Sequence, residues 1–511
     1  MKKNNFYITT PIYYPSGQPH MGHAYSSILA DVFARYMRND NYKVHFLTGT
    51  DEHGLKIQKA AEKDGQEPLL YCDKISKVFK DLSSKLCLSN DDFIRTTEKR
   101  HHKSVNELWN RLTKSGDIYL SKYKGWYSVS DEAYYNEDEV IKKNGKNVST
   151  FSGSTVEWVE EESFFFKLSK WQNKLLDFYD KQEKFILPLS RKNEVVNFVK
   201  SGLKDLSVSR TSFTWGIKVP ENTKHVIYVW LDALTNYLSA LNFPNIDDKL
   251  YKSFWPASLH VIGKDILRFH AIYWPAFLFA AGIEPPNRVF GHGWILSGDE
   301  KMSKSKGNIL DPLEIIKKYG VDELRYYLMK EVSHGSDGNI SLKSLENCIN
   351  SDLANNYGNL CQRVFSFIKN NCKNMVTKSK NISDADKNLI KQTKILTDNL
   401  RNLMNDQNLN NYIKSVINIS FLTNKYINDE EPWKLKKDNI IKMNNILHLS
   451  LEQIAKISIL LNPIMPIATT KVLEALKIEP KLRNLSFLDG KELLSKEIKL
   501  NELNILFKKI N

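Results

Sequence analysis

Residues 6–48 read FYITTPIYYPSGQPHMGHAYSSILADVFARYMRNDNYKVHFLT. Residues 6–10 and 43–48 are rich in the β-branched and aromatic side chains that are typical of strands. Between them, residues 24–38 carry apolar side chains at helical spacing. Because strands that alternate with helices form parallel sheets covered by those helices, we expect a doubly wound, Rossmann-type α/β fold.

The pattern changes twice along the chain. Short aromatic strands and a polar, turn-rich patch between residues 116 and 224 predict a small α+β insertion that interrupts the first domain. Apolar runs at 226–231 and 288–296 then predict further strands of the sheet, and long helical patterns dominate after about residue 345. We therefore expect a Rossmann first half at 1–115, an insertion at 116–224, a Rossmann second half at 225–344 and an all-α domain at 345–511.

Composition restricts the class of protein. None of the five cysteines has a paired C-x-x-C spacing, which argues against a disulfide framework and favours a reducing cytoplasm. No run is apolar and long enough to span a bilayer, and no signal or transit pattern precedes the first strand, so we expect a soluble protein. The formal charge of +14 suits a polyanion such as RNA, although an AT-rich genome would also yield a lysine-rich chain.

The first motif with chemical content is His20-Met21-Gly22-His23, between the first expected strand and helix. A helix N-terminus offers unpaired N–H groups and a positive dipole end to a phosphate. Two imidazoles three residues apart add donors on the same turn, and Gly22 allows a base or phosphate to approach the backbone closely. The alternative is a chance pair of histidines at a helix start.

The second motif is Lys301-Met302-Ser303-Lys304-Ser305, in a loop after the last expected strand. Two lysines three residues apart can surround a triphosphate and neutralise the charge that grows on a leaving pyrophosphate. The alternative, a solvated basic loop, is common. A chance origin becomes a poor explanation when both motifs occur in this order on suitable elements.

The two motifs together resemble the HIGH and KMSKS motifs of class I aminoacyl-tRNA synthetases. Within that class, four further segments resemble the methionyl-tRNA synthetases, and the resemblance extends over essentially the whole chain. These segments are Thr9-Thr10-Pro11-Ile12-Tyr13-Tyr14-Pro15, Gly49-Thr50-Asp51-Glu52-His53-Gly54, Tyr228-Val229-Trp230-Leu231-Asp232-Ala233 and Gly263-Lys264-Asp265-Ile266. The resemblance implies a ligase that activates L-methionine with ATP and Mg²⁺ and transfers it to tRNA(Met), including initiator tRNA, for protein synthesis.

The resemblance also implies roles for individual residues. The positions that match the methionine pocket are Ile12, Tyr14, Asp51, Trp230, Ala233, Leu234, Tyr237, Ile266 and His270. The positions that match the ATP site are His20, Gly22, His23, Asp265, His292, Gly293, Ile295 and Lys304, and the catalytic positions are His20, His23, Lys301 and Lys304. A thioether gains from aromatic edges, and Asp51 would hold the substrate ammonium by a charge-assisted hydrogen bond.

Asn359, Arg363 and Trp433 match family positions that read the anticodon, in keeping with stacking and amide recognition of unstacked RNA bases. Many relatives carry cysteine pairs in the insertion and bind zinc there, but this chain has no cysteine between residues 88 and 347. We therefore expect no structural zinc or other metal site. We expect a monomer, because the extra C-terminal module that makes some relatives dimers is absent.

Other classes of function remain open at this point. A synthetase for leucine, valine or isoleucine would need a larger insertion for its editing domain, and one for cysteine would be expected to use a cysteine-built zinc site. A catalytically inactive tRNA-binding relative would not need both phosphate motifs. A nucleotidyltransferase acting on a small molecule would use both, but it would leave the basic helical domain unexplained.

Overall fold

The computed structural model describes residues 4–15, 17–131, 133–135, 137–143, 145–297, 300–301, 310–379 and 381–510. The chain divides into two compact units. The sheet unit comprises Met1–Pro19, His45–Ser84 and Asn90–His292, and the helical unit comprises His20–Val44, Lys85–Ser89 and Gly293–Asn511. In the described part of the chain, no helix is long and apolar enough to cross a membrane.

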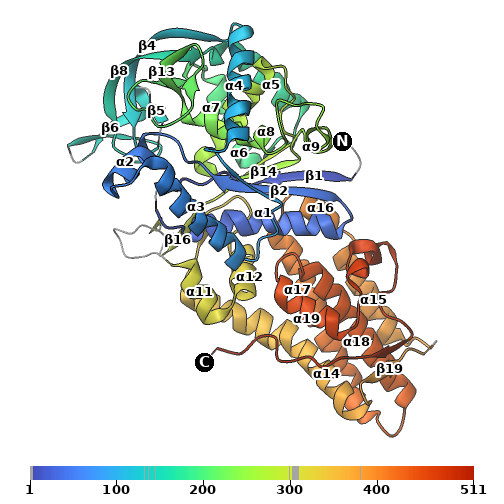
Figure 1. The fold of residues 1–511 in the computed structure, drawn as a ribbon. Coiled ribbons are helices and arrows are strands. Elements are labelled where there is room, and N and C mark those ends of the chain that lie inside the picture. Colours follow the sequence, from blue (N-terminus) through green and yellow to red (C-terminus); the bar gives the residue numbers. More distant parts are fainter. Residues whose placement is uncertain are drawn as a thin grey trace. The chain divides into compact units, whose positions relative to one another are not determined.

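A six-stranded sheet forms the centre of the sheet unit (Figure 1). In spatial order its strands are β3 (Asp92–Arg95), β2 (Lys43–Thr50), β1 (Asn5–Thr9), β14 (Leu259–Gly263), β15 (Val289–His292) and β9 (Ile186–Leu187). The β1–β14, β14–β15, β15–β9 and β2–β3 pairs are parallel. The expected parallel α/β sheet is therefore confirmed.

Helices of the sheet unit bury regularly spaced apolar residues. In α4 (Lys99–Lys114), the buried Val105, Leu108, Trp109 and Leu112 recur at intervals of three and four residues and join the core that contains β1 and β14. The other helices are α2 (Leu55–Lys63), α3 (Pro68–Lys85), α5 (Gln172–Lys181), α6 (Leu189–Lys200), α7 (Val229–Leu234), α8 (Asn236–Ser239), α9 (Lys249–Phe254) and α10 (Trp274–Ala280).

The segment expected as an insertion contains two long antiparallel strands, β4 (Ile118–Ser128) and β8 (Glu157–Phe166). Its shorter strands are β5 (Ala133–Tyr135), β6 (Val140–Lys143), β7 (Lys146–Ser149), β10 (Leu206–Ser207), β11 (Ser209–Arg210), β12 (Lys218–Val219) and β13 (Asn222–Ile227). Strand β9 lies within this segment, yet it pairs with β15 in the main sheet. The segment therefore returns once to the Rossmann sheet.

Two expected strands have different structures. The strand expected at 226–231 ends at Ile227 as β13, and α7 begins at Val229, because a short apolar run suits a buried helix as well as a strand. The strand expected at 288–296 divides into β15 and β16 (Ile295–Ser297), which belong to different sheets. The sequence pattern cannot show that division, because both pieces are apolar.

The helical unit combines α1 (Met21–Asn39) with the C-terminal helices (Figure 1). These are α11 (Pro312–Tyr319), α12 (Val321–Glu331), α13 (Leu342–Cys348), α14 (Asn359–Asn371), α15 (Asp384–Thr397), α16 (Leu400–Asn405), α17 (Leu409–Glu430), α18 (Ile440–Leu461) and α19 (Pro466–Ala475). Its strands are β16, β17 (Glu300–Lys301), β18 (Gly338–Asn339), β19 (Met375–Thr377) and β20 (Glu497–Lys499). The expected helical C-terminal region is confirmed.

Candidate functional site

The carboxyl ends of the parallel strands carry several residues that the sequence predicts to bind ligands. Ile12 and Tyr14 follow β1, Asp51 follows β2, and Asp265 and Ile266 follow β14. In a parallel sheet these strand ends lie at one edge, which is where ligands bind in open α/β folds. The main sheet therefore brings residues as far apart in the sequence as Ile12 and Ile266 to a common edge.

Tyr237 and His270 form a buried hydrogen-bonded pair. The Tyr237 hydroxyl lies 2.7 Å from His270 Nε2, and His270 Nδ1 lies 3.0 Å from the Ile266 carbonyl oxygen. Because a carbonyl can only accept, Nδ1 carries the proton, and Nε2 of the neutral ring accepts from the tyrosine. Burial lowers the pKa of His270 to about 4, so this ring is neutral near pH 7.

The same pair connects with other predicted pocket residues. Burial raises the pKa of Tyr237 well above its ordinary value, and the negative charge of Asp51 contributes in the same direction. The Trp230 ring stacks on Phe269, the neighbour of His270 in the chain, with 3.6 Å between ring centroids. Tyr237 and His270 are thus in direct contact, Trp230 stacks on the residue next to His270 in the chain, and the charge of Asp51 acts on Tyr237.

Helix α7 supplies the apolar part of this cluster. Ala233 and Leu234 are buried, and Trp230 and Ile12 are half-buried against the same core. Tyr14 packs against a neighbouring core that includes Tyr13. These surroundings can take up a flexible apolar side chain, and the aromatic rings suit a polarizable sulfur.

The segment 49–54 is held by a network that the sequence did not predict. Glu52 is fully buried, and its carboxylate accepts hydrogen bonds from Arg95 at 2.7 and 3.0 Å. The Thr50 and Thr97 hydroxyls donate to the same carboxylate, at 2.7 and 2.5 Å. These contacts fix the Glu52 carboxylate beside Asp51 in the same segment.

A second network joins this segment to α7. The fully buried Asp232 accepts from His53 Nδ1 at 2.6 Å and from His101 Nε2 at 2.7 Å. Burial alone would raise the pKa of the Asp232 carboxyl, but the two imidazoles hold it well below its ordinary value. Asp232 therefore clamps the segment that carries Asp51 to the helix that carries Trp230. The motifs around His53 and Asp232 were visible in the sequence, but their contact was not.

Asp265 and His292 lie at the ends of neighbouring strands. Gly263 pairs with His292 in the β14–β15 register, and a Cβ atom at Gly263 would lie 2.5 Å from Asp265 Oδ1 and 3.7 Å from His292 Cε1. Glycine at this position therefore allows the Asp265 carboxylate to fold back over the strand end. The exposed carboxylate is an acceptor suited to vicinal hydroxyls such as those of a ribose.

In the helical unit, His20 and His23 form the N-terminal cap of α1. Gly22 N–H donates to His20 Nδ1, and His20 N–H donates to His23 Nδ1, both at 3.1 Å. Both Nδ1 atoms accept, so each neutral ring carries its proton on Nε2. The rings stack with 3.8 Å between centroids. This geometry presents two imidazole donors beside a helix N-terminus, as an anion site requires.

Gly22 has a structural reason to lack a side chain. A Cβ atom at this position would lie 3.0 Å from His20 Cε1 and 3.1 Å from His20 Nδ1. Any larger residue would therefore crowd the His20 ring and require it to shift slightly. The close contact with His20 is a constraint on this position in addition to the expected approach of a ligand to the backbone.

Of the other positions that match the ATP site, His292 ends β15, Gly293 lies in the connection after it, and Ile295 begins β16. A Cβ atom at Gly293 would lie 2.0 Å from the Ser336 carbonyl oxygen, so only glycine fits. Ile295 pairs with Gly338 in β16–β18, and the backbone of Lys301 pairs with Leu296 in β16–β17. Lys304 lies outside the described residues, as do the other positions of 302–309.

Asn359, Arg363 and Trp433 all belong to the helical unit. Asn359 and Arg363 are one turn apart on α14, and Arg363 Nη2 donates to Asn428 Oδ1 of α17 at 2.7 Å. Trp433, which is 40% exposed, follows α17 directly in the 3₁₀ turn Pro432–Lys434.

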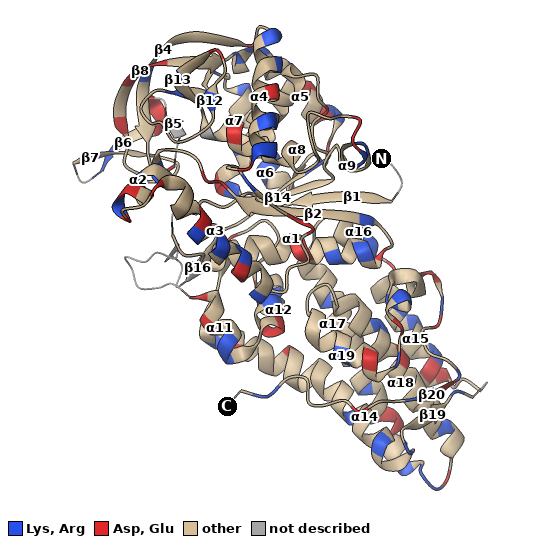
Figure 2. Cartoon of the chain, in the orientation of Figure 1, with Lys and Arg blue, Asp and Glu red and all other residues tan. Residues whose placement is uncertain are grey.

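The segment that carries Trp433 also touches α14. The Lys436 ammonium lies 5.2 Å from the Phe367 ring of α14, and Lys434, Lys436 and Lys437 are exposed. An exposed indole among lysines is chemically suited to stacking on unpaired bases and to phosphate contacts. Elsewhere, both basic and acidic residues occur on α15 and α18 (Figure 2). The excess of positive charge therefore does not mark this surface by itself.

In the segment expected as an insertion, Asp131 forms a hydrogen-bonded knuckle with Ser128, Tyr135, Ser152 and Ser154. Its carboxylate accepts from the Tyr135 hydroxyl at 2.8 Å, from the Ser154 hydroxyl at 2.7 Å and from the Ser152 hydroxyl, and its N–H faces the Ser128 hydroxyl. Among the residues that the structure describes, no group of three or more His, Cys, Asp or Glu is placed to hold a metal ion. The expected lack of zinc stays a prediction.

Comparison with known proteins gives matches over nearly the whole chain. The family model described as tRNA synthetases class I (M) matches residues 6–147 and 142–365. The model described as the anticodon binding domain of methionyl tRNA ligase matches residues 376–511.

Individual relatives and solved structures agree with the family models. The methionine--tRNA ligase of Rickettsia typhi (strain ATCC VR-144 / Wilmington) is 48% identical over 512 residues, covering 99% of this chain and 100% of that protein. That of Brucella suis biovar 1 (strain 1330) is 46% identical over 479 residues, covering 94% and 93%. The structure of Mycobacterium tuberculosis methionyl-tRNA synthetase in complex with methionyl-adenylate superimposes with a TM-score of 0.96 at 42% identity, covering 99% of each chain.

Proposed function

The chain belongs to the class I methionyl-tRNA synthetases, and from that membership we propose that it activates L-methionine with ATP and transfers it to tRNA(Met). The methionine carboxylate attacks the α-phosphorus of ATP, giving methionyl-adenylate and pyrophosphate. A ribose hydroxyl at the 3′ end of tRNA then takes the methionyl group and releases AMP. Neither step needs a covalent protein intermediate, so positioning and electrostatic stabilisation carry the catalysis.

We propose that the Asp51–Trp230–Tyr237–His270 cluster binds methionine. Asp51 holds the ammonium, and the aromatic rings and the side chains of Ile12, Tyr14, Ala233, Leu234 and Ile266 surround the thioether. The convergence of the cluster within one unit is the observation that carries the proposal. The neutral His270 and its fixed tautomer keep a charge away from the apolar substrate side chain.

For the nucleotide, we propose a role for each group of residues. The Nε2–H groups of His20 and His23 donate to phosphate oxygens, and Gly22 keeps His20 in its capping position. Asp265 accepts from the ribose hydroxyls, while His292, Gly293 and Ile295 face the adenine. Lys304 contacts the transition state and Lys301 supports it.

ATP enters with Mg²⁺ on its phosphates, which lowers the negative charge that the histidines and lysines must neutralise. We propose that the insertion needs no zinc, because the Asp131 knuckle supplies the hydrogen bonds that hold its turns together. Retention of full activity after exhaustive chelation and readdition of Mg²⁺ alone would support this, and loss of activity that zinc restores would contradict it.

We propose that Asn359, Arg363 and Trp433 read the anticodon of tRNA(Met), including the initiator, so that the enzyme serves initiation and elongation. Arg363 and Asn359 supply base-edge hydrogen bonds, and the exposed Trp433 supplies a stacking surface. We further propose a cytoplasmic monomer with domains at 1–115, 116–224, 225–344 and 345–511. Sedimentation of the purified chain tests the oligomeric state.

ATP–pyrophosphate exchange across all twenty amino acids tests the central proposal. We expect exchange with methionine, and charging of tRNA(Met) in a second assay. Replacing Asp51 by Asn should raise the KM for methionine more than the KM for ATP, because the amide lacks the charge that holds the ammonium. Asp64→Asn is the matched control, since Asp64 is an exposed acid of the same unit paired with Lys74. Exchange with another amino acid, or with none, would contradict the proposal.

A further inference from the structure

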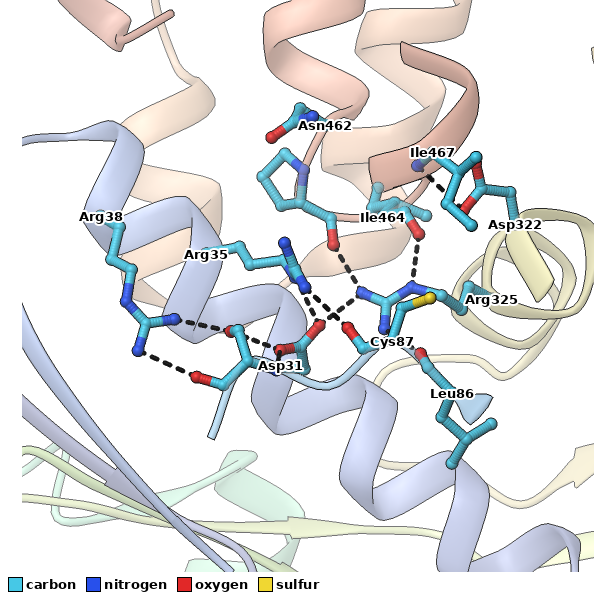
Figure 3. Close-up of polar contacts among 12 residues, drawn as sticks. Asp31, Arg35, Arg38, Leu86, Cys87, Asp322, Arg325, Asn462, Ile464 and Ile467 are labelled. Carbon is cyan, nitrogen blue, oxygen red and sulfur yellow. Dashed lines mark hydrogen bonds and ion pairs between the residues drawn. The ribbon is translucent and has the colours of Figure 1, made fainter. Parts of the chain in front are cut away.

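Arg325 of α12 is fully buried, and its guanidinium joins three segments of the helical unit (Figure 3). Nε donates to the Ile464 carbonyl at 2.8 Å, and Nη1 donates to the Leu86 carbonyl at 3.0 Å. Nη2 donates to Asp31 Oδ2 at 2.6 Å and to the Pro463 carbonyl at 2.8 Å. One side chain therefore contacts α1, the turn at 85–89 and the turn between α18 and α19.

Asp31 is the partner of Arg325 on α1, and it is also fully buried. Its Oδ2 accepts from Arg35 Nε at 2.7 Å, and its Oδ1 accepts from the Ser89 N–H and hydroxyl at 2.7 and 2.6 Å. Burial alone would raise the pKa of Asp31, but Arg325 and Arg35 hold it below its ordinary value. The carboxylate therefore remains charged and keeps all of these contacts.

The turn at 85–89 is held in a conformation that its sequence disfavours. Cys87 has a φ of +56°, in the left-handed region that residues other than glycine rarely adopt. The Cys87 carbonyl accepts from Arg35 Nη2 at 2.6 Å, and the preceding Leu86 carbonyl accepts from Arg325. Such backbone strain persists where surrounding contacts over-determine the conformation. The guanidinium groups provide those contacts here.

The position of Asp31 on α1 connects this network to the phosphate motif. Helix α1 runs without interruption from Met21 to Asn39, and its N-terminal cap is the His20–His23 pair. Asp31 is eight residues beyond His23, which corresponds to about 12 Å along a helix. A continuous helix moves as a rigid element over such a length, so a displacement at Asp31 also displaces the imidazoles.

We propose that Arg325 is a positioning residue for catalysis, which fixes α1 and its His20–His23 pair against the turn at 463–464. The proposal rests on the proposed function, since it assumes that the two histidines contact ATP. A buried ion pair contributes little net stability, because desolvation of its charges offsets their attraction. Its geometric effect is larger, since four acceptors from three segments share one planar donor group.

The test compares Arg325→Gln, Arg325→Lys and the control Tyr326→Phe at a temperature where each is folded. The control lies on the same helix and removes one buried hydrogen bond, from the Tyr326 hydroxyl to Asp352 at 2.8 Å, without involving α1. We expect Arg325→Gln to lower the kcat of pyrophosphate exchange about 10- to 100-fold, the range for a misplacement of about 1 Å. The KM for methionine should stay within about twofold, and the lysine variant should recover part of the kcat.

Amide hydrogen exchange of α1 provides a readout that does not depend on activity. We expect Arg325→Gln to accelerate exchange along α1, and Tyr326→Phe to leave it unchanged. Unchanged α1 protection or an unchanged kcat in Arg325→Gln would overturn the proposal, as would an equal loss of kcat in the control. If the wild-type chain shows no ATP–pyrophosphate exchange, the proposed function fails. The amide hydrogen exchange of α1 still decides whether Arg325 positions the helix. Should Arg325→Gln not fold, Asp31→Asn carries the same test.

Discussion

Replacing Asp232 by Asn should weaken the contacts that hold the Asp51 segment against α7 in the proposed methionine site. The carboxylate accepts from His53 and His101 on opposite oxygens, at 2.6 and 2.7 Å. An asparagine keeps one acceptor oxygen, but its amide N–H₂ then faces an imidazole N–H. That imidazole must change its tautomer or move, and either change relaxes the link between the Asp51 segment and α7.

The size of the effect follows from the burial of this cluster. Asp232 and His101 are completely inaccessible to solvent, and His53 is 3% exposed. A hydrogen bond to a charged group contributes about 1.5–3 kcal/mol. In Asp232→Asn, one of the two hydrogen bonds from the histidines is replaced by an unfavourable N–H to N–H contact. We therefore expect the free energy of unfolding to fall by about 2–4 kcal/mol. We also expect the KM for methionine to rise about 10-fold. Asp51, which is proposed to hold the ammonium, and Trp230, which is proposed to contact the thioether, lie on the two segments that Asp232 joins.

Urea unfolding and methionine-dependent pyrophosphate exchange measure the two effects separately. Ser239→Ala is the control, since it removes the Ser239 hydroxyl, which contacts His101 Nδ1 at 2.9 Å and the Thr235 carbonyl at 3.0 Å, and it leaves both hydrogen bonds to Asp232 in place. It should change the KM for methionine less than twofold. If Asp232→Asn unfolds at the wild-type urea concentration and keeps the wild-type KM, the clamp has neither of the effects that we assign to it.

Three further predictions concern other parts of the chain. Lys304→Ala should slow adenylate formation by about 3 kcal/mol in activation free energy while leaving methionine affinity nearly unchanged, and stopped-flow rates equal to wild type would refute this. Trp433→Ala should weaken tRNA charging but spare pyrophosphate exchange, whereas equal loss in both assays would assign Trp433 to folding. Burial raises the pKa of Glu323 from 4.5 to about 7, so the folded state binds this proton more tightly and loses stability as pH rises through that interval. Glu323→Gln should therefore be more stable than wild type at pH 8, by about 1–3 kcal/mol, and the difference in urea unfolding should shrink toward pH 4.5.

Local sequence patterns predicted the elements whose apolar spacing is clear. The strand at 6–10 and the helix at 24–38 correspond to β1 and α1, because β-branched and aromatic side chains favour an extended backbone and an apolar spacing of about 3.6 residues favours a helix. The apolar runs at 226–231 and 288–296 were less informative. An apolar run such as 226–231 can be buried in a strand or in a helix, and one such as 288–296 can be buried in one sheet or in two. Composition therefore could not decide between these structures.

The sequence alone determined which residues have side chains suited to bind the substrates. Short motifs have characteristic residue types and spacings, and at a helix start or a strand end these fix the local geometry of the side chains. It could not determine which partners those residues have. Asp232 with His53 and Arg325 with Asp31 are separated by 179 and 294 positions. Such contacts exist only when packing brings distant segments together and removes water from between them, which strengthens each charge–charge contact and makes an unpaired charge costly. The tertiary structure therefore decided how the motifs are held.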